Sequence, residues 1–314
     1  MQFHRPFRFG VVTHNSGASL EALVARACLA EHLGYSTFLI PDHLNDQFDT
    51  ALALAMVARA TSTLRIGSFV FANDFRHPAL LARIAATLDV ISGGRFELGL
   101  GAGWMQSEYE QIGFPFAPPR DRIDRLVESL QVIKSLFSID PVTFAGIHYQ
   151  ITNMRGLPSP VQFPRPPIVV GGSGKRILSV AAREADIVSI LPRSMVEPGS
   201  RRIDLEDASA ASVARKVMWI REAAAERLHD LELNLFIVDI ALSDRREDGA
   251  DRLARRFMLS REQVMETPHL LAGTVDQVSE QIREIREEYS VSYLVVFDEY
   301  MERFAPVVAQ LANH

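Results

Sequence analysis

The chain has 314 residues, of which 47% are hydrophobic and 23% charged, and its net charge is −6 at pH 7. This composition is ordinary for a globular protein and excludes disordered, collagen-like and coiled-coil chains. The sequence has no block of like charges that would bind nucleic acid or an anionic membrane surface.

Strands and helices alternate along the first half of the chain. Short apolar runs predict strands at 8–13, 37–40, 65–71 and 96–101. Amphipathic or alanine-rich segments with capping residues predict helices at 19–33, 50–61, 78–92 and 121–137. Prolines and glycines then crowd the segment 138–167, which we interpret as an insertion with a small hairpin around 143–151.

The alternation resumes after this insertion. Strands are expected at 168–170, 187–190, 233–242 and 292–297. Helices are expected at 175–184, 209–228, 248–257, 275–289 and 303–312. The polar segment 192–207 is predicted to be a loop.

Eight strand–helix units in this order favour one fold class, an α/β protein with a (β/α)8 TIM barrel and insertions. A doubly wound sheet also alternates, but it uses about five or six strands in each domain. We therefore expect a single barrel domain over residues 1–314, with its active site at the carboxyl ends of the strands.

The chain has one cysteine, Cys28, which excludes a disulfide framework and a cysteine-rich metal site. Cys28 falls in an apolar helical pattern, and we interpret it as a small core residue. The histidines show no metal-binding spacing, so no metal is expected. Neither a signal peptide nor a membrane span is evident, so we expect a cytoplasmic protein.

A histidine follows the second expected strand in the sequence Pro41-Asp42-His43. Histidine changes charge near neutrality, and a neighbouring acid can orient it, so His43 is a candidate acid or base. The alternative is a loop histidine with ordinary hydrogen bonds. The barrel frame favours the functional interpretation.

Polar residues also follow the third strand, where Asn73 and Arg76 are candidates to bind a polar ligand. The alternative interpretation is a capped helix start, in which Asp74 or His77 satisfies the free amides before Pro78. The sequence leaves both interpretations open.

Two glycine-rich runs follow later strands. The run 99–103 would let a flat ligand approach the backbone, and Trp104 could stack on it, although the spacing does not match a dinucleotide-binding fingerprint. The run 171–174 opens a helix that begins with Lys175 and Arg176, and its free amides favour a phosphate. The charged run 120–125 is interpreted as a solvated helix face with local ion pairs.

These motifs, taken in order, resemble the luciferase-like monooxygenase superfamily, and more closely its coenzyme F420-dependent oxidoreductases. The matching segments are FLIPDH at 38–43, LRIGSFVFANDFRHP at 64–78, LDVISGGRFELGLGAGW at 88–104, PPIVVGGSGKRIL at 166–178 and LLAGTVDQV at 270–278. The resemblance implies a barrel enzyme that holds F420 or flavin mononucleotide (FMN) at the carboxyl mouth.

The resemblance also assigns roles to residues. The cofactor phosphate would be bound by Gly171, Gly172, Ser173 and Gly174, with Lys175 and Arg176 beside them. The ring would be supported from behind by a bulge at Phe69-Val70, often a cis peptide in the family. The ring or its ribityl chain would be edged by Gly101, Gly103, Trp104 and Ser107, with Asn73 beside them. Asp42 is counted with the cofactor-binding residues, and His43 matches a histidine that works as acid or base in some F420 dehydrogenases.

One departure from the pattern affects the expected substrate. Trp104 stands where F420-dependent sugar-phosphate dehydrogenases carry an acid, which argues against glucose-6-phosphate chemistry and favours a more apolar substrate. The segment 192–207 would then act as a lid.

Three functions are weighed on this basis. The first is an F420-dependent oxidoreductase that transfers a hydride to or from a small organic molecule. The second is an FMN monooxygenase that uses reduced flavin, supplied by a partner reductase, and oxygen. The third is a non-catalytic flavin-binding protein. Related barrels are often dimers, so the resemblance also suggests a homodimer.

Overall fold

The computed structural model describes residues 5–13, 19–193 and 204–312. Contacts divide the chain into two compact units. Unit 1 comprises residues 1–14, 29–38 and 171–314, and unit 2 comprises residues 15–28 and 39–170. Three elements have residues in both units, namely α1 (Leu20–His32), β2 (Thr37–Ile40) and β8 (Ile168–Gly172).

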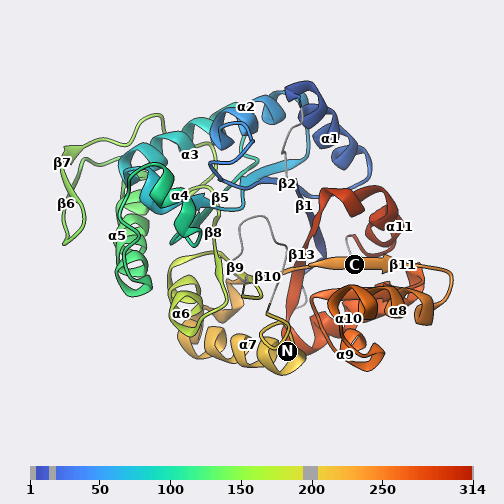
Figure 1. Ribbon diagram of the computed structural model, residues 1–314. Helices are drawn as coiled ribbons and strands as arrows, with labels where there is room; N and C mark the ends of the chain where they lie inside the picture. Colours follow the sequence, from blue (N-terminus) through green and yellow to red (C-terminus); the bar gives the residue numbers. More distant parts are fainter. Residues whose placement is uncertain (1–4, 14–18, 194–203, 313–314) are drawn as a thin grey trace. The chain divides into compact units, whose positions relative to one another are not determined.

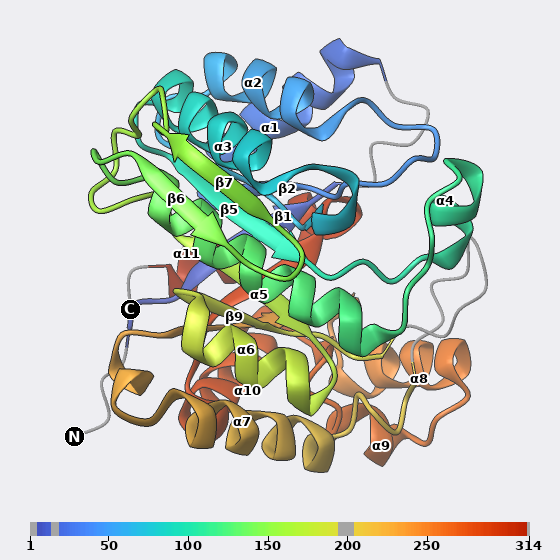
Figure 2. The same cartoon turned by 90° about the vertical axis from the view of Figure 1, so that its left-hand side faces the viewer.

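The main sheet of unit 1 is parallel and buried. Strand β13 (Val291–Phe297) lies between β1 (Arg8–Val12) and β10 (Glu232–Phe236), and β10 also pairs with β9 (Ile187–Ile190) (Figure 1). The helices of this unit are α6 (Lys175–Glu184), α7 (Ala210–Ala224), α8 (Arg246–Phe257), α9 (Arg261–Met265), α10 (Val275–Tyr289) and α11 (Met301–Leu311). Helices α6 and α7 lie side by side (Figure 2).

Unit 2 has a second set of parallel strands. Strand β5 (Phe96–Gly101) pairs with β3 (Arg65–Ser68), with the short β4 (Phe71–Ala72) and with the first part of β8. The helices of this unit are α2 (Thr50–Ala60), α3 (Pro78–Ser92), α4 (Gln106–Gln111) and α5 (Pro119–Leu136).

The ends of the helices follow the capping signals in the sequence. Pro78 occupies the first turn of α3, where the Nδ1 of His77 accepts a hydrogen bond from the amide of Ala79 at 3.2 Å. Gly93 ends the helix in the left-handed conformation, with φ of 66°. His77 therefore has the capping role that the sequence allowed.

The predicted strand 233–242 is wrong as one continuous element. Strand β10 ends at Phe236, and the chain then forms β11 (Asp239–Leu242), which pairs in parallel with β12 (Leu270–Gly273) in a separate small sheet. The chain passes from one sheet to the other at Ile237 and Val238. The amide of Ile237 donates to the carbonyl of Val295 on β13, and the amide of Val238 donates to the carbonyl of His269, next to β12. Helices α8 and α9 pack on this small sheet through a cluster that includes Leu253 and Val264.

Three smaller predictions also need correction. Cys28 is exposed rather than part of the core. The predicted helix 209–228 ends early, because Ala225 has a φ of 49° and starts a 3-10 helix (Ala225–His229). The arginine run on α5 is only partly a solvated face, because Arg122 is buried and its guanidinium stacks 3.9 Å from the ring of Phe116.

The expected insertion contains the predicted hairpin, formed by β6 (Val142–Ala145) and the antiparallel β7 (Gln150–Met154). In Figure 1 the hairpin projects beyond α5. Glu128 of α5 holds its turn, because the carboxylate accepts from the amides of Ile147, His148 and Tyr149 at 2.8–3.1 Å.

The rest of the insertion is tied to α3 by a buried acid. Asp89 is 0% exposed, and its Oδ2 accepts from the amides of Val161 and Gln162 at 2.7 and 2.9 Å. Its Oδ1 accepts from the side-chain amide of Gln162 at 2.6 Å. One carboxylate thus satisfies three donors of the insertion.

Replacing Asp89 with alanine is expected to destabilise unit 2 by about 1–3 kcal/mol, because three donors of the insertion lose their buried acceptor. Urea denaturation measures the change, and limited proteolysis should show faster cleavage within 155–165. Asp121→Asn, an exposed residue on α5, serves as the control. Unchanged cleavage and stability in Asp89→Ala would show that the insertion is held by other contacts.

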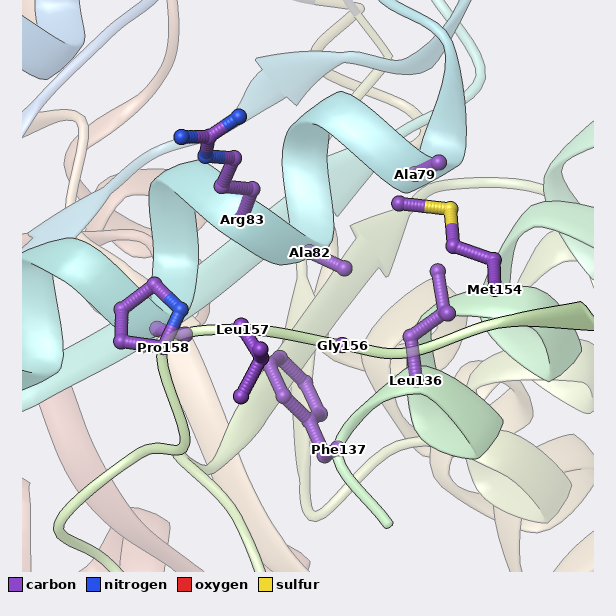
Figure 3. Close-up of a pocket in the computed structure, with 10 residues that line it drawn as sticks. Ala79, Ala82, Arg83, Leu136, Phe137, Met154, Gly156, Leu157 and Pro158 are labelled. Carbon is purple, nitrogen blue, oxygen red and sulfur yellow. The ribbon is translucent and has the colours of Figure 1, made fainter. Parts of the chain in front are cut away.

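An apolar crevice lies between α3 and the insertion (Figure 3). Ala79 and Ala82 of α3 face Met154, Leu136 and the stretch from Gly156 to Pro158. Its volume is about 10 Å³, room for about one water molecule, so it is a packing defect rather than a ligand pocket. Among the described residues, no helix is long and apolar enough to span a membrane.

Candidate active site

His43 is held by an acid that the sequence analysis did not identify. Glu108 of α4 is buried, and its Oε1 lies 2.9 Å from Nδ1 of His43. The same oxygen accepts from the amide of Leu44 at 2.9 Å. Because a carboxylate only accepts, Nδ1 of His43 carries the proton in this bond. In a neutral ring, Nε2 then presents its lone pair.

Trp104 lies against this histidine. The two ring centroids are 5.9 Å apart and the planes meet at 87°, an edge-to-face contact. Trp104 remains 47% exposed, and His43 keeps 23% of its side chain exposed. Both rings are therefore accessible to a ligand while their positions are restrained. Ser107, one residue before Glu108, is half-buried on the same short helix.

Asp42 forms a bidentate ion pair with Arg76. The guanidinium donates to its two carboxylate oxygens at 2.6 and 2.9 Å. Oδ2 also accepts from the amide of Ala72 at 3.0 Å. Asp42 and Arg76 therefore join the segment after β2 to β4, and the geometry gives both a structural role. Burial lowers the pKa of Arg76, but Asp42 and Asp49 outweigh it and raise that pKa overall.

Asn73 is fully buried and has one atom without a partner. Its side-chain amide donates to Tyr149 at 3.3 Å and lies 3.5 Å from Oδ1 of Asp74. Its Oδ1 is buried and accepts no hydrogen bond among the described residues. A buried acceptor without a donor is costly, and a bound ligand with an N–H or O–H would satisfy it.

Asp74 organises the residues around Asn73. It accepts from the hydroxyl of Tyr109 at 3.1 Å and lies 3.5 Å from Arg125. Burial and the charge of Asp74 raise the pKa of Tyr109, which stays a neutral donor.

The third predicted strand is interrupted where the resemblance implied a bulge. The bond between Phe69 and Val70 is a non-proline cis peptide, and it separates β3 from β4. The amide of Phe69 donates to Ile40 at 2.9 Å. Both residues are half-buried.

Close packing within the protein explains why glycines occur at the end of β5 and just after it. A Cβ on Gly101 would lie 2.6 Å from Val70, and Gly103 has a φ of 76° with the hydroxyl of Tyr109 in the place of a Cβ. These close approaches account for both glycines through packing alone. The role that the resemblance implies for them stays a prediction.

The second glycine run lies in unit 1, at the start of α6. Gly171 packs against β9, because a Cβ there would lie 2.7 Å from Ser189. Ser173 is half-buried, and Gly174 is exposed with open space where a Cβ would lie. No side chain caps the helix at Gly174, and its first turn has no acid. The free amides of this helix start fit an anion.

Two cations follow these glycines. Lys175 and Arg176 are exposed, and Lys175 lies 3.8 Å from Glu222 of α7. This pair is on the surface and is worth little energetically, so Lys175 is available to an anion at small cost.

The predicted lid at 192–207 lies largely outside the described residues, but its two ends are described. The amide of Arg193 donates to Asp207 at 2.8 Å, and the amide of Asp204 donates to Arg193 at 2.9 Å. Lys216 of α7 is 0% exposed and donates to Oδ2 of Asp207 at 2.7 Å and to the carbonyl of Leu191 at 3.0 Å. These contacts form the loop base.

Comparison with known proteins decides the family. Residues 1–292 match the family described as luciferase-like monooxygenase. The chain belongs to this family. Two curated relatives of this luciferase-like chain are named as F420-dependent dehydrogenases.

Curated relatives include enzymes named for different cofactors. An F420-dependent hydroxymycolic acid dehydrogenase of Mycobacterium tuberculosis is 32% identical over 185 residues, covering 56% of this chain and 51% of the relative. An FMNH(2)-dependent dimethylsulfone monooxygenase of Pseudomonas putida is 30% identical over 142 residues, covering 45% and 39%. The luciferase-like chain thus spans about half the length of the first curated relatives it matches.

Solved structures confirm the fold class, an α/β protein with a (β/α)8 barrel. The coenzyme F420-dependent tetrahydromethanopterin reductase of Methanopyrus kandleri has a TM-score of 0.77, with 19% identity over 98% of this chain and 99% of that one. The EDTA monooxygenase of Chelativorans sp. BNC1 has a TM-score of 0.78 with 15% identity, covering 98% and 94%. At these identities the likeness shows the fold alone.

Proposed function

We propose that the luciferase-like chain is an F420-dependent oxidoreductase that transfers a hydride between the deazaflavin and a small organic substrate. The observation that carries the proposal is the His43–Glu108 pair beside Trp104, with the unpartnered Oδ1 of Asn73 in the same unit. The relatives named for F420 support this cofactor, and the relative named for FMNH(2) supports the alternative.

The residues of the chain fit a cofactor of this class. In unit 2, Asn73 offers a buried acceptor to a ring N–H or a hydroxyl. In unit 1, considered by itself, the free amides at the start of α6 suit an anionic group. The deazaflavin, when bound, supplies the hydride acceptor or donor. What the protein contributes is placement and proton handling.

His43 is suited to handle the proton. When an alcohol carbon loses its hydride, the hydroxyl proton must leave, and the lone pair on Nε2 can accept it. The imidazolium that forms is stabilised by the carboxylate of Glu108 at 2.9 Å. In the reverse direction the same imidazolium returns the proton to a carbonyl oxygen.

A second candidate function is an FMN monooxygenase, which the 30% identical dimethylsulfone monooxygenase favours. It would require reduced FMN from a partner reductase. Glu108 and His43 would then position the substrate, since oxygen chemistry belongs to the reduced flavin.

Cofactor titrations separate the two candidates. We expect F420 to raise the melting temperature more than FMN does, and Asn73→Ala to weaken F420 binding by about tenfold. Fluorescence quenching gives the dissociation constants, and His148→Gln, exposed on the hairpin, is the control. Stabilisation by FMN without stabilisation by F420 would reject the first function and leave the second.

A further inference from the structure

Unit 1 contains a cavity of about 460 Å³ that the proposed function does not use. Residues of β11, α8, the 3-10 helix (Asp298–Tyr300) and α11 line it. Strand β11 follows the end of β10, and the 3-10 helix and α11 follow the end of β13. Barrels of this class bind their ligands in segments that follow the carboxyl ends of the strands. The volume is in the range of small-molecule sites.

The buried acid in the lining of the cavity is Asp239, whose charge is balanced by groups of the protein itself. Its Oδ1 accepts from the hydroxyl of Tyr300 and from the amide of Ile240, both at 2.7 Å. Its Oδ2 forms an ion pair with Arg256 at 2.9 Å. Burial and the neighbouring carboxylate raise the pKa of Tyr300, which therefore stays a neutral donor. The negative charge of Asp239 is thus neutralised locally.

Two further guanidinium groups line the same cavity. Arg252 donates to the carbonyl of Ile240 at 3.0 Å, and Arg303 makes no hydrogen bond or ion pair with the described residues. The remaining acid in the lining is Glu299. The lining thus has three arginines and two carboxylates, which leaves a net charge of +1. Arg252 and Arg303 have N–H donors that remain free for a ligand.

We propose that this cavity binds the carboxylate or phosphate group of a small molecule, and that Arg252 and Arg303 hold it. The planar guanidinium donates two parallel hydrogen bonds to such an oxyanion, which gives both affinity and orientation. The volume exceeds what the oxyanion itself needs, so the rest of the molecule has room against Ile240, Leu242 and Leu253. The proposal is independent of the redox cofactor.

Equilibrium dialysis of the full chain tests this site with two separate probes, radiolabelled inorganic phosphate and radiolabelled succinate, at an ionic strength fixed with chloride. Arg303→Gln and Arg252→Gln should each weaken binding by about tenfold. Arg255→Gln, exposed on the same turn of α8 and outside the cavity, is the matched control and should bind normally.

Lys175→Gln separates the cavity from the start of α6. Succinate binding should be unchanged in this variant, and the probe that binds the cavity more tightly identifies the preferred oxyanion. The proposal is overturned if neither probe binds the unmodified chain, if Arg303→Gln and Arg252→Gln bind like it, or if Lys175→Gln alone abolishes binding. The melting temperatures of Arg252→Gln, Arg303→Gln and Arg255→Gln show whether each variant is folded.

Discussion

Replacing Glu108 with alanine is expected to lower turnover by about a hundredfold, because His43 loses the group that fixes its ring. The amide of Leu44 loses its acceptor in the same variant. Glu108→Gln should be milder, since the amide oxygen can still accept from both donors while the charge is removed. The two variants therefore separate positioning from electrostatic stabilisation of the imidazolium.

One readout of this prediction needs no substrate. The ¹⁵N chemical shifts of the His43 imidazole report which nitrogen carries the proton. We expect a single Nδ1–H tautomer in the unmodified chain and in Glu108→Gln, and a mixture in Glu108→Ala. The matched control is Glu110→Ala, an exposed acid on the same helix that accepts from Gln106. An unchanged tautomer and full turnover in Glu108→Ala would show that Glu108 does not position His43.

Replacing Asp207 with asparagine is expected to destabilise the chain by about 3–5 kcal/mol, because the buried ammonium of Lys216 loses its counter-charge. Urea denaturation at pH 7 measures the change, with Asp230→Asn, an exposed acid, as control. Adding Lys216→Met to Asp207→Asn should recover much of the lost stability, since neither buried charge of this pair then remains. A double variant as unstable as Asp207→Asn would show that the charge is not the cause.

The same pair makes stability depend on pH. Burial raises the pKa of Asp207, but Lys216 and the donors Arg193 and Ser212 outweigh it, so the pKa lies below its usual value. The unfolded chain then binds more protons than the folded chain at acidic pH. The contribution of Asp207 is complete above the ordinary aspartate pKa, about 4, and is lost as the pH falls through the folded value. Asp207→Asn should remove this acid-side loss.

Elements with a clear period or a clear end were predictable from the sequence. The helix at 78–92 and the strand at 96–101 have the expected bounds, because proline and glycine mark their ends. The strand at 233–242 was wrong because its apolar residues continue through the bend at Ile237 and Val238, and hydrophobicity does not show where pairing changes partner. The residues that accept hydrogen bonds at the bend are Val295 and His269, which lie far along the chain and are not marked by the local sequence.

The candidate site was predictable where a motif marks it. His43 and Asn73 were identified from their motifs, whereas Glu108 was not, because an acid on a short polar helix looks like a surface residue. Only its pairing with His43, 65 positions earlier, makes it part of the site. Arg122 was misjudged for the same reason, since its stacking on Phe116 is invisible in a charged run.

The loop base formed by Arg193, Asp204, Asp207 and Lys216 has a consequence for how this protein can diverge. Because the contacts at the base already bring its two ends together, adding residues between positions 193 and 204 costs mainly chain-closure entropy, about 0.6 kcal/mol for each doubling of length. Insertions in that stretch should therefore change the free energy of unfolding far less than replacing Asp207 or Lys216 does.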